Sequence, residues 1–472
     1  MSIYICTCNT KTQTNATTDN TCLSSLKVSP NGRYIQTRDG KPFFYMGDTS
    51  WELFHRLSRE EIKQYLESRK QLMFNVVQAV AIGELDGLRA KNAYGDLPMR
   101  LDNIAIPDTT SGNDVNDTLS YDYWDHIEYG IKLAAKNDMY IALLPCWGEY
   151  VTPRFTDTIV FSDSIKGYNY GWFIGNRFKK YNNIIWILGG DRFPNEIAHG
   201  ISTWNAMAEG INDGVCNIYE PNGKANYEST FMSYHCMYPA SVWFASAPWL
   251  DVDMWGTYHE KRDNDRSFEV PYILANSKNI RPTINAEPPY EDAGINYDFN
   301  NGYFDDFDVR QHAYWSVLAG CVGHTYGNNA LWQCINKNTY HKNRDPRHKQ
   351  WYDALYAQGA QQMKYLRLLI EEINILEMVP NQKLIAYNIH DPTGHIQAAS
   401  GTDFALYYIP TGKELNAQMG IIKGEKIFAT WYDPKTGQKT QIGEYVNKGI
   451  VKFTPPGKPQ RGNDWVLILK SL

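Results

Sequence analysis

The sequence predicts an α/β protein in which a (β/α)8 TIM barrel is followed by a small antiparallel β-sandwich domain. From about residue 42 onward, short apolar runs rich in β-branched and aromatic residues alternate with longer segments of helical period, the pattern of parallel βα units. Beyond Pro380 the alternation stops, and strand-like runs follow one another without helices. We therefore expect a disordered leader at residues 1–26, the barrel at 27–377 and the second domain at 378–472.

Four strand and helix alternations are legible in the first half of the barrel. The first predicted helix begins with a capping box from Ser58 to Glu61 and carries Ile62, Tyr65 and Leu66 on one face, as an amphipathic helix requires. A later helix has Trp124, Ile127, Ile131 and Ala134 at helical spacing. The predicted strands are 42–48, 74–82, 139–147 and 183–191.

The second half supplies four further strand candidates, which brings the expected number to eight. These candidates are residues 231–237, 252–256, 281–287 and 320–327. A long amphipathic segment at 350–373 is expected to be the closing helix of the barrel.

The C-terminal segment contains short runs that alternate with turns rich in Gly, Pro and Asn, which is typical of an antiparallel β domain. The predicted strands of this domain are KLIAYNI (383–389), FALYYIP (404–410), KIFATWYD (426–433), IVKFTPP (450–456) and WVLILK (465–470).

Composition and charge exclude several classes of function. With 46 Lys and Arg against 52 Asp and Glu, the chain has no basic stripe of the kind that binds a phosphate backbone, so we expect no nucleic-acid partner. No run approaches the roughly 18 apolar residues of a membrane-spanning helix. The Thr- and Asn-rich leader with Cys6, Cys8 and Cys22 is compatible with an incomplete export signal, so we expect a protein exported to the periplasm or lipid-anchored at the cell surface. The sequence leaves the oligomeric state open.

Two carboxyl groups end predicted barrel strands on the edge where TIM barrels carry their active sites. Asp191 follows the apolar strand IIWILGG, whose two glycines allow a close approach of substrate. Glu287 ends the strand TINAE before Pro288 and Pro289, which disfavour the α conformation before them. Hydrolysis of a glycosidic bond needs such a pair. The alternatives are a helix cap for Asp191 and a buried ion pair for Glu287.

Further polar and aromatic residues near strand ends are candidates for substrate binding. Asp48 is equally suited to cap a helix, and a lone histidine or an aromatic ring near a strand end is more often structural. The candidates are Asp48, Trp147, Arg192, His235, Trp255, Tyr290, His324 and Tyr326.

No motif for a metal or a cofactor stands out. The sequence lacks HExxH, an EF-hand loop and a clustered Cys/His spacing, and it also lacks a GxSxG elbow, a Walker loop and a dinucleotide glycine signature. We therefore predict neither a catalytic metal nor a cofactor.

Several blocks together resemble the bacterial apiosidase family, glycoside hydrolase family 140. They are GDTSWELFHRLSREEIKQYLESRK (47–70), FNVVQ (74–78), NIIWILGGDR (183–192) and INAEPPYE (284–291). The tail blocks TWYDPKTGQ and NDWVLILK are similar to the domain commonly called a collagen-binding domain that accompanies such barrels. Trp51 and Gln78, which lie in these blocks, complete the predicted set of substrate-binding residues.

The resemblance implies a secreted pectin-degrading enzyme of Bacteroidota. Its reaction would be hydrolysis of the bond between apiose and galacturonic acid in rhamnogalacturonan II, with Asp191 as acid/base and Glu287 as nucleophile. Leu72 and Met73 depart from the small residue usual before FN. A galacturonate leaving group would be met by Arg192, His235 or His324. The alternatives are a hydrolase of another glycosidic linkage and a non-catalytic protein that binds carbohydrate or matrix.

Overall fold

Eight parallel strands form the central sheet of the protein, which a computed structural model describes over residues 23–154, 159–337, 345–387 and 391–472. The strand order is β10-β11-β12-β3-β4-β7-β8-β9, and each neighbouring pair is parallel. The strands are β3 (Tyr45–Thr49), β4 (Val76–Val80), β7 (Tyr140–Leu144), β8 (Ile184–Gly189), β9 (Met232–His235), β10 (Asp253–Gly256), β11 (Thr283–Glu287) and β12 (Gly323–Tyr326). Each lies within one of the eight predicted runs or overlaps it, so the predicted barrel is confirmed.

The barrel is not fully closed between β9 and β10. Isolated hydrogen bonds connect these two strands, whereas the other neighbouring strands form a ladder. The Asp251 amide donates to the Met232 carbonyl at 3.0 Å, and the Ser233 hydroxyl donates to the Val252 carbonyl at 2.7 Å. The open seam therefore lies beside His235, the last residue of β9.

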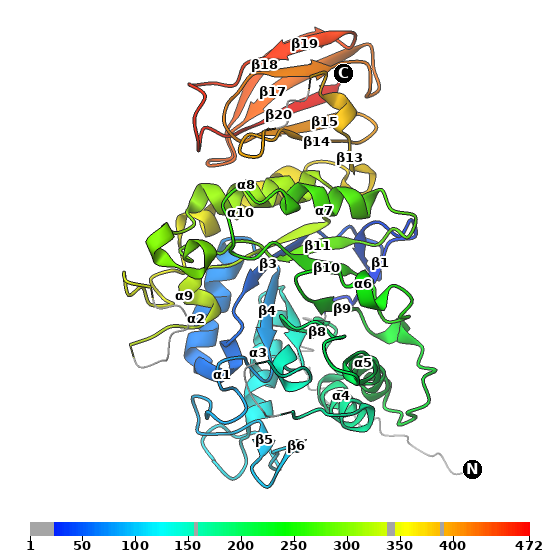
Figure 1. Ribbon diagram of the computed structural model, residues 1–472, viewed down its shortest axis with the longest axis vertical. Coiled ribbons are helices and arrows are strands. Elements are labelled where there is room, and N and C mark those ends of the chain that lie inside the picture. The colour runs from blue at the N-terminus through cyan, green and yellow to red at the C-terminus, as the bar shows by residue number, and fades with distance from the viewer. Residues whose placement is uncertain (1–22, 155–158, 338–344, 388–390) are drawn as a thin grey trace, which may run out of the picture.

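Helices cover the outside of the barrel in chain order (Figure 1). The helix α2 (Arg59–Gln71) begins with the predicted capping box, in which Ser58 and Glu61 bond each other's backbone amides. A hairpin of β5 (Met99–Arg100) and β6 (Asn103–Pro107) interrupts the second βα unit. The other helices are α1 (Leu53–Arg56), α3 (Tyr123–Lys136), α4 (Ser164–Phe178), α5 (Gly200–Cys216), α6 (Ser241–Phe244), α7 (Arg266–Ala275), α8 (Asp306–Leu318), α9 (Asn329–Trp332) and α10 (Gln358–Glu371).

The helices α4 and α5, which flank β8 in the chain, approach each other closely through glycines. A Cβ atom at Gly171 would lie 2.3 Å from the Met207 carbonyl oxygen, and one at Gly210 would lie 2.1 Å from that of Tyr168. Only glycine allows this backbone contact. The two helices that precede and follow β8 in the chain are in this way packed directly against each other.

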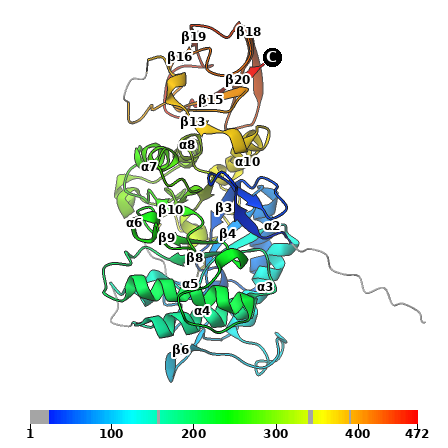
Figure 2. The same ribbon diagram turned by 90° about the vertical axis from the view of Figure 1, so that its right-hand side faces the viewer.

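The C-terminal domain is an antiparallel sheet packed at one end of the long axis, against α7, α8 and α10 (Figures 1 and 2). Its apolar side chains include Leu415, Ala429 and Phe453, and they form a core of their own between this sheet and the short β16–β19 pair. The sheet order is β13 (Val379–Pro380), β14 (Gln397–Ser400), β15 (Phe404–Ile409), β20 (Trp465–Ser471), β17 (Lys426–Tyr432) and β18 (Lys439–Val446), and the pair is β16 (Leu415–Gln418) with β19 (Ile450–Phe453).

Two predicted elements differ in the structure. The closing helix α10 begins at Gln358 rather than at residue 350, because turns place Trp351 and Leu355 in the core before the helix starts. The run KLIAYNI is a 3-10 turn with a single bridge from Ile385 to Ala417, not a strand, and its last two residues lie outside the described range.

The N-terminal part of the chain is described only from residue 23. Most of the predicted leader, including Cys6, Cys8 and Cys22, lies outside the described residues, and β1 (Leu26–Val28) already pairs with β2 (Ile35–Thr37). None of the described helices combines the length and the apolar character needed to cross a bilayer.

A buried ion pair joins the two domains. The guanidinium group of Arg310 on α8 donates to both carboxylate oxygens of Asp464 at 2.7 and 2.8 Å, and each side chain is at most 1% exposed. Removal of the Asp464 charge would leave the buried Arg310 guanidinium group with only the partly exposed Asp306, at 3.0 Å, as a charged partner.

We predict that Asp464→Asn lowers the free energy of unfolding by about 3 to 5 kcal/mol, measured by urea denaturation. The matched control is Glu414→Gln, which breaks the exposed Lys452–Glu414 pair and should leave the unfolding midpoint unchanged. Equal midpoints for the two variants would contradict a stabilising role for the interdomain pair.

Candidate active site

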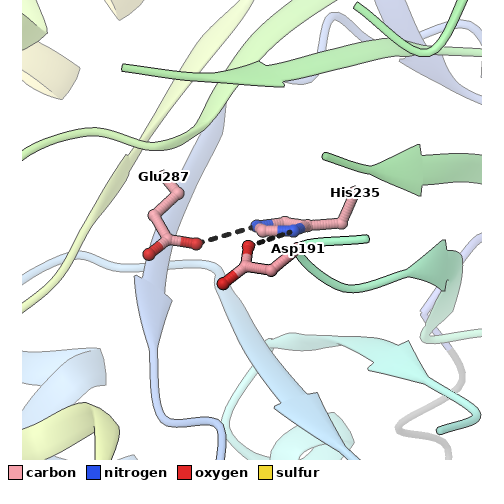
Figure 3. Close-up of side chains that lie close together, drawn as sticks. All are labelled: Asp191, His235 and Glu287. Atoms are coloured by element: carbon pink, nitrogen blue, oxygen red, sulfur yellow. Dashed lines mark ion pairs between the residues drawn. The ribbon is translucent and has the colours of Figure 1, made fainter. Parts of the chain in front are cut away.

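Asp191, His235 and Glu287 converge at the carboxyl ends of the strands (Figure 3). Asp191 follows β8 by two residues, His235 ends β9 and Glu287 ends β11. One side-chain nitrogen or oxygen from each residue lies within 4.8 Å of the corresponding atoms of the other two. The two carboxyl groups selected from the sequence thus lie in one site, with an imidazole between them.

The backbone before Asp191 turns in a conformation that requires glycine. Gly189 and Gly190 have φ values of 88° and 123°, and Asp191 itself has a φ of 54°. A Cβ atom at Gly190 would lie 2.8 Å from the Trp147 ring and 2.9 Å from the Gly148 nitrogen. Aspartate is one of the few other residues that tolerate the left-handed region. The GGD sequence therefore turns the chain sharply at the end of β8.

The surroundings of Asp191 favour its protonated form. Burial raises the pKa of its carboxyl group, and the negative charge of Glu287 raises it further. His235 and the Tyr258 hydroxyl, which donates to Oδ1 of Asp191 at 2.6 Å, act in the opposite direction without reversing the shift. Asp191 is therefore suited to donate a proton.

The surroundings of Glu287 favour its ionised form. Burial alone would raise the pKa of this carboxyl group, but His235 and His259 lower it below its usual range. Their Nε2 atoms lie 3.3 and 3.4 Å from its two oxygens. Nδ1 of His259 accepts a hydrogen bond from the Tyr290 amide at 3.2 Å, so Nε2, which faces Glu287, is the nitrogen that carries a proton.

The surroundings of His235 favour its protonated form. Burial would lower the pKa of its imidazole, but the charges of Glu287 and Asp191 raise it above its ordinary value. Nδ1 lies 3.7 Å from Asp191, and the ring packs edge-on against Trp51, with centroids 5.2 Å apart. This aromatic wall fixes the imidazole between the two acids.

The same three residues are close enough to ligate a metal ion, and they form such a cluster within the described part of the chain. A metal would bind through a nitrogen lone pair of His235. The two nitrogens of this ring face the carboxyl groups of Asp191 and Glu287 at 3.7 and 3.3 Å. This spacing also allows the three residues to share protons.

A pocket of about 550 Å³ of empty space, open solvent included, lies over the two carboxyl groups. Trp51, Trp147 and Tyr290, three predicted binding residues, form part of its aromatic wall. The complete lining is Trp51, Glu84, Trp147, Asp191, Tyr258, His259, Glu287, Tyr290, Ala293, Gly294, Tyr297, Asn329 and Trp332.

Two predicted binding residues on the first two barrel strands lie away from this lining. Asp48 is fully buried and accepts hydrogen bonds from the Tyr65 hydroxyl at 2.7 Å and from Arg69 at 2.9 Å. Gln78, also fully buried, donates to Thr49 and to the Ala286 carbonyl. We expected both residues to bind substrate. The structure instead uses their polar atoms in hydrogen bonds within the protein.

Four more predicted binding residues are also absent from the pocket lining. Arg192 contacts Glu149 at 2.5 Å, Trp255 donates to Thr283 at 3.1 Å, and Tyr326 donates to Glu291 at 2.6 Å. His324 is fully buried, and burial lowers its pKa to about 3. His235 is 1% exposed and also absent from the lining, so the expected contact of Arg192, His235 or His324 with a galacturonate has no support in this geometry.

Tyr258 and His259 are the contacts of the two acids that the sequence reasoning missed. They lie two and three residues beyond the end of β10, outside the strand end at 256 that the sequence predicted. Their position depends on a register shift between Trp255 and Gly256 and on the left-handed backbone of Tyr258, with a φ of 54°. The other missed lining residues are Glu84, Ala293, Gly294, Tyr297, Asn329 and Trp332, which follow β4, β11 and β12.

The model of the family described as "Apiosidase-like, catalytic domain" matches residues 29–377. The chain belongs to this family. The match confirms the resemblance seen in the sequence blocks. A second family model, "Putative collagen-binding domain of a collagenase", matches residues 379–470 of this apiosidase-like protein. A search of curated proteins gives no match.

Solved structures extend the comparison to the whole chain. A structure titled "Glycoside hydrolase" is 32% identical, with 95% of this chain and 97% of that chain covered and a TM-score of 0.82. A glycoside hydrolase family 5 protein from Bacteroides vulgatus ATCC 8482 is also 32% identical, with 95% and 93% covered and a TM-score of 0.82. The apiosidase-like protein is therefore a glycoside hydrolase with a carbohydrate substrate.

We predict that Tyr258→Phe shifts the alkaline limb of the hydrolase's pH–rate profile to higher pH. The Tyr258 hydroxyl stabilises the ionised form of Asp191. Its loss raises the pKa of Asp191 further, so the acid keeps its proton to a higher pH. Initial rates across pH would measure the limb. The control Tyr150→Phe removes a hydroxyl bonded to the Gly83 carbonyl and should leave the alkaline limb where it is. A shift of this limb to lower pH in Tyr258→Phe would contradict the role given to Tyr258.

Proposed function

We propose that the enzyme hydrolyses the bond between apiose and galacturonic acid in the side chains of rhamnogalacturonan II, a pectin, by a retaining mechanism. The apiosidase-like family model supports the substrate class. The observation that carries the mechanism is the pair of adjacent carboxyl groups whose pKa values are shifted in opposite directions, upward for Asp191 and downward for Glu287. Such a divergence separates the roles of acid and nucleophile.

In the first step, ionised Glu287 attacks the anomeric carbon, and the bond from that carbon to the glycosidic oxygen breaks. Asp191 transfers its proton to the departing oxygen, so the leaving sugar is released neutral at that atom. In the second step, Asp191 takes a proton from water. The water oxygen then attacks the anomeric carbon and releases the Glu287 carboxylate, which restores the enzyme.

The two histidines have separate tasks in this reaction. The positive charge of His235 and the Nε2–H group of His259 stabilise the Glu287 carboxylate before attack. His235 also approaches Asp191. We assign both as positioning residues, because they face the catalytic carboxyl groups and shift their pKa values.

The carboxyl separation supports retention of configuration. An oxygen of Asp191 and an oxygen of Glu287 lie within 4.8 Å. Retaining enzymes hold their carboxyl groups about 5 to 5.5 Å apart, whereas inverting enzymes need about 6.5 to 9.5 Å to admit water. The second candidate is hydrolysis of a different glycosidic linkage by the same two residues, since fold alone does not select a substrate.

We predict that Asp191→Asn and Glu287→Gln each lower kcat on rhamnogalacturonan II fragments at least about a hundredfold, because each removes a group that reacts. Free apiose would be measured by chromatography. Glu228→Gln, an exposed carboxyl group outside the pocket, should keep wild-type turnover. Release of another sugar by the wild type would favour the second candidate.

We predict that the first product formed keeps the anomeric configuration of the substrate. Proton NMR during the first minutes of hydrolysis, before the free sugar equilibrates, would distinguish the two anomers. Initial appearance of the opposite anomer would contradict the double displacement and would place a water molecule between the carboxyl groups instead.

A further inference from the structure

Side-chain exposure increases along the pocket from Glu287 to its rim. The side chain of Glu287 is 8% exposed and that of Asp191 is 25% exposed. Tyr297, which also lines the pocket, is 46% exposed. The pocket therefore has an inner end at the nucleophile and an outer rim that carries a large aromatic residue.

This gradient orients a substrate, if the two carboxyl groups have the roles given in the proposed function. The sugar that is attacked must lie against Glu287 at the inner end. The leaving oxygen must lie near Asp191, which protonates it. The leaving group then extends toward the more exposed part of the pocket, and Tyr297 is more exposed than either carboxyl group.

The backbone holds Tyr297 in a fixed and unusual position. Asn296 and Tyr297 have φ values of 53° and 60°, and two successive residues other than glycine in the left-handed region are uncommon. The Asn296 amide donates to the His259 carbonyl at 2.7 Å. The Tyr297 ring packs edge-on against His259, with centroids 5.5 Å apart and an interplanar angle of 83°.

An aromatic ring held in place while nearly half exposed is suited to a ligand. A fixed ring loses little conformational entropy on binding, and its flat face with a polar hydroxyl matches the face of a sugar ring. We propose that Tyr297 binds the leaving-group sugar by stacking and so makes the enzyme select substrates whose leaving group is a sugar ring. This inference rests on the proposed function for the direction of the substrate.

The test compares two substrates that share the apiose unit, a methyl apioside without a leaving-group ring and an apiosyl-galacturonate. Tyr297→Ala is expected to lower kcat/KM on the apiosyl-galacturonate about tenfold more than on the methyl apioside, mainly by raising KM. This is the loss expected when about one aromatic ring contact is removed. Tyr297→Phe, which keeps the ring, should retain most of the preference.

Tyr303→Ala is the matched control, because Tyr303 pairs with Gly294 in the same loop and is 43% exposed, but it does not line the pocket. It should leave the ratio of kcat/KM between the two substrates unchanged. Equal losses on both substrates for Tyr297→Ala, or equal effects of Phe and Ala, would overturn the inference in favour of a structural role beside His259.

Failure of the proposed function gives a separate result. If the wild type cleaves neither apioside, the apiose assignment fails. The two test substrates are then synthesised again, with apiose replaced by the sugar that the wild type releases from pectin fractions. The ratio between the substrate with a ring and the one without still decides the role of Tyr297.

Discussion

The active site depends on one electrostatic constraint: two carboxyl groups whose oxygens lie within 4.8 Å are held in a largely buried pocket. Two uncompensated negative charges there would be strongly unfavourable. The raised pKa of His235 favours a positive charge, and the raised pKa of Asp191 favours its protonated form, so both shifts reduce the net negative charge of the cluster. The glycine turn after β8 and the Trp51 wall serve this arrangement, because they fix the distances on which the compensation depends.

The sequence predicted the barrel because its strands are buried on both faces and read as apolar runs between amphipathic helices. Asp191 and Glu287 were found because position at a strand end is visible in such a pattern. The sequence pattern does not show the direction in which a side chain points. Asp48 ends its predicted strand as clearly as Glu287 does, yet it pairs with Arg69 of α2 in the buried layer between the sheet and this helix. Tyr258 and His259 depend on an irregular register that no periodicity reveals.

The sequence also predicted the second domain only in part. Its strands follow from local patterns, except at residues 383–389, where apolar residues pack in a turn. Its attachment depends on Arg310 and Asp464, which are 154 residues apart in the sequence. The domain covers α7, α8 and α10 at one end of the molecule (Figure 1), and it contributes no residue to the pocket over the two acids. Among the described residues, the lining of this pocket comes entirely from the barrel.

The two causes of the raised pKa of Asp191 also explain how this residue can act first as an acid and then as a base. Burial and the charge of Glu287 are the causes of its raised pKa. In the proposed double displacement, Glu287 loses its charge when it bonds to the anomeric carbon, so the second cause disappears while His235 and Tyr258 still favour the ionised form. The pKa of Asp191 must then fall. The residue that has just released a proton is thereby prepared to accept one from water, without any movement of the protein.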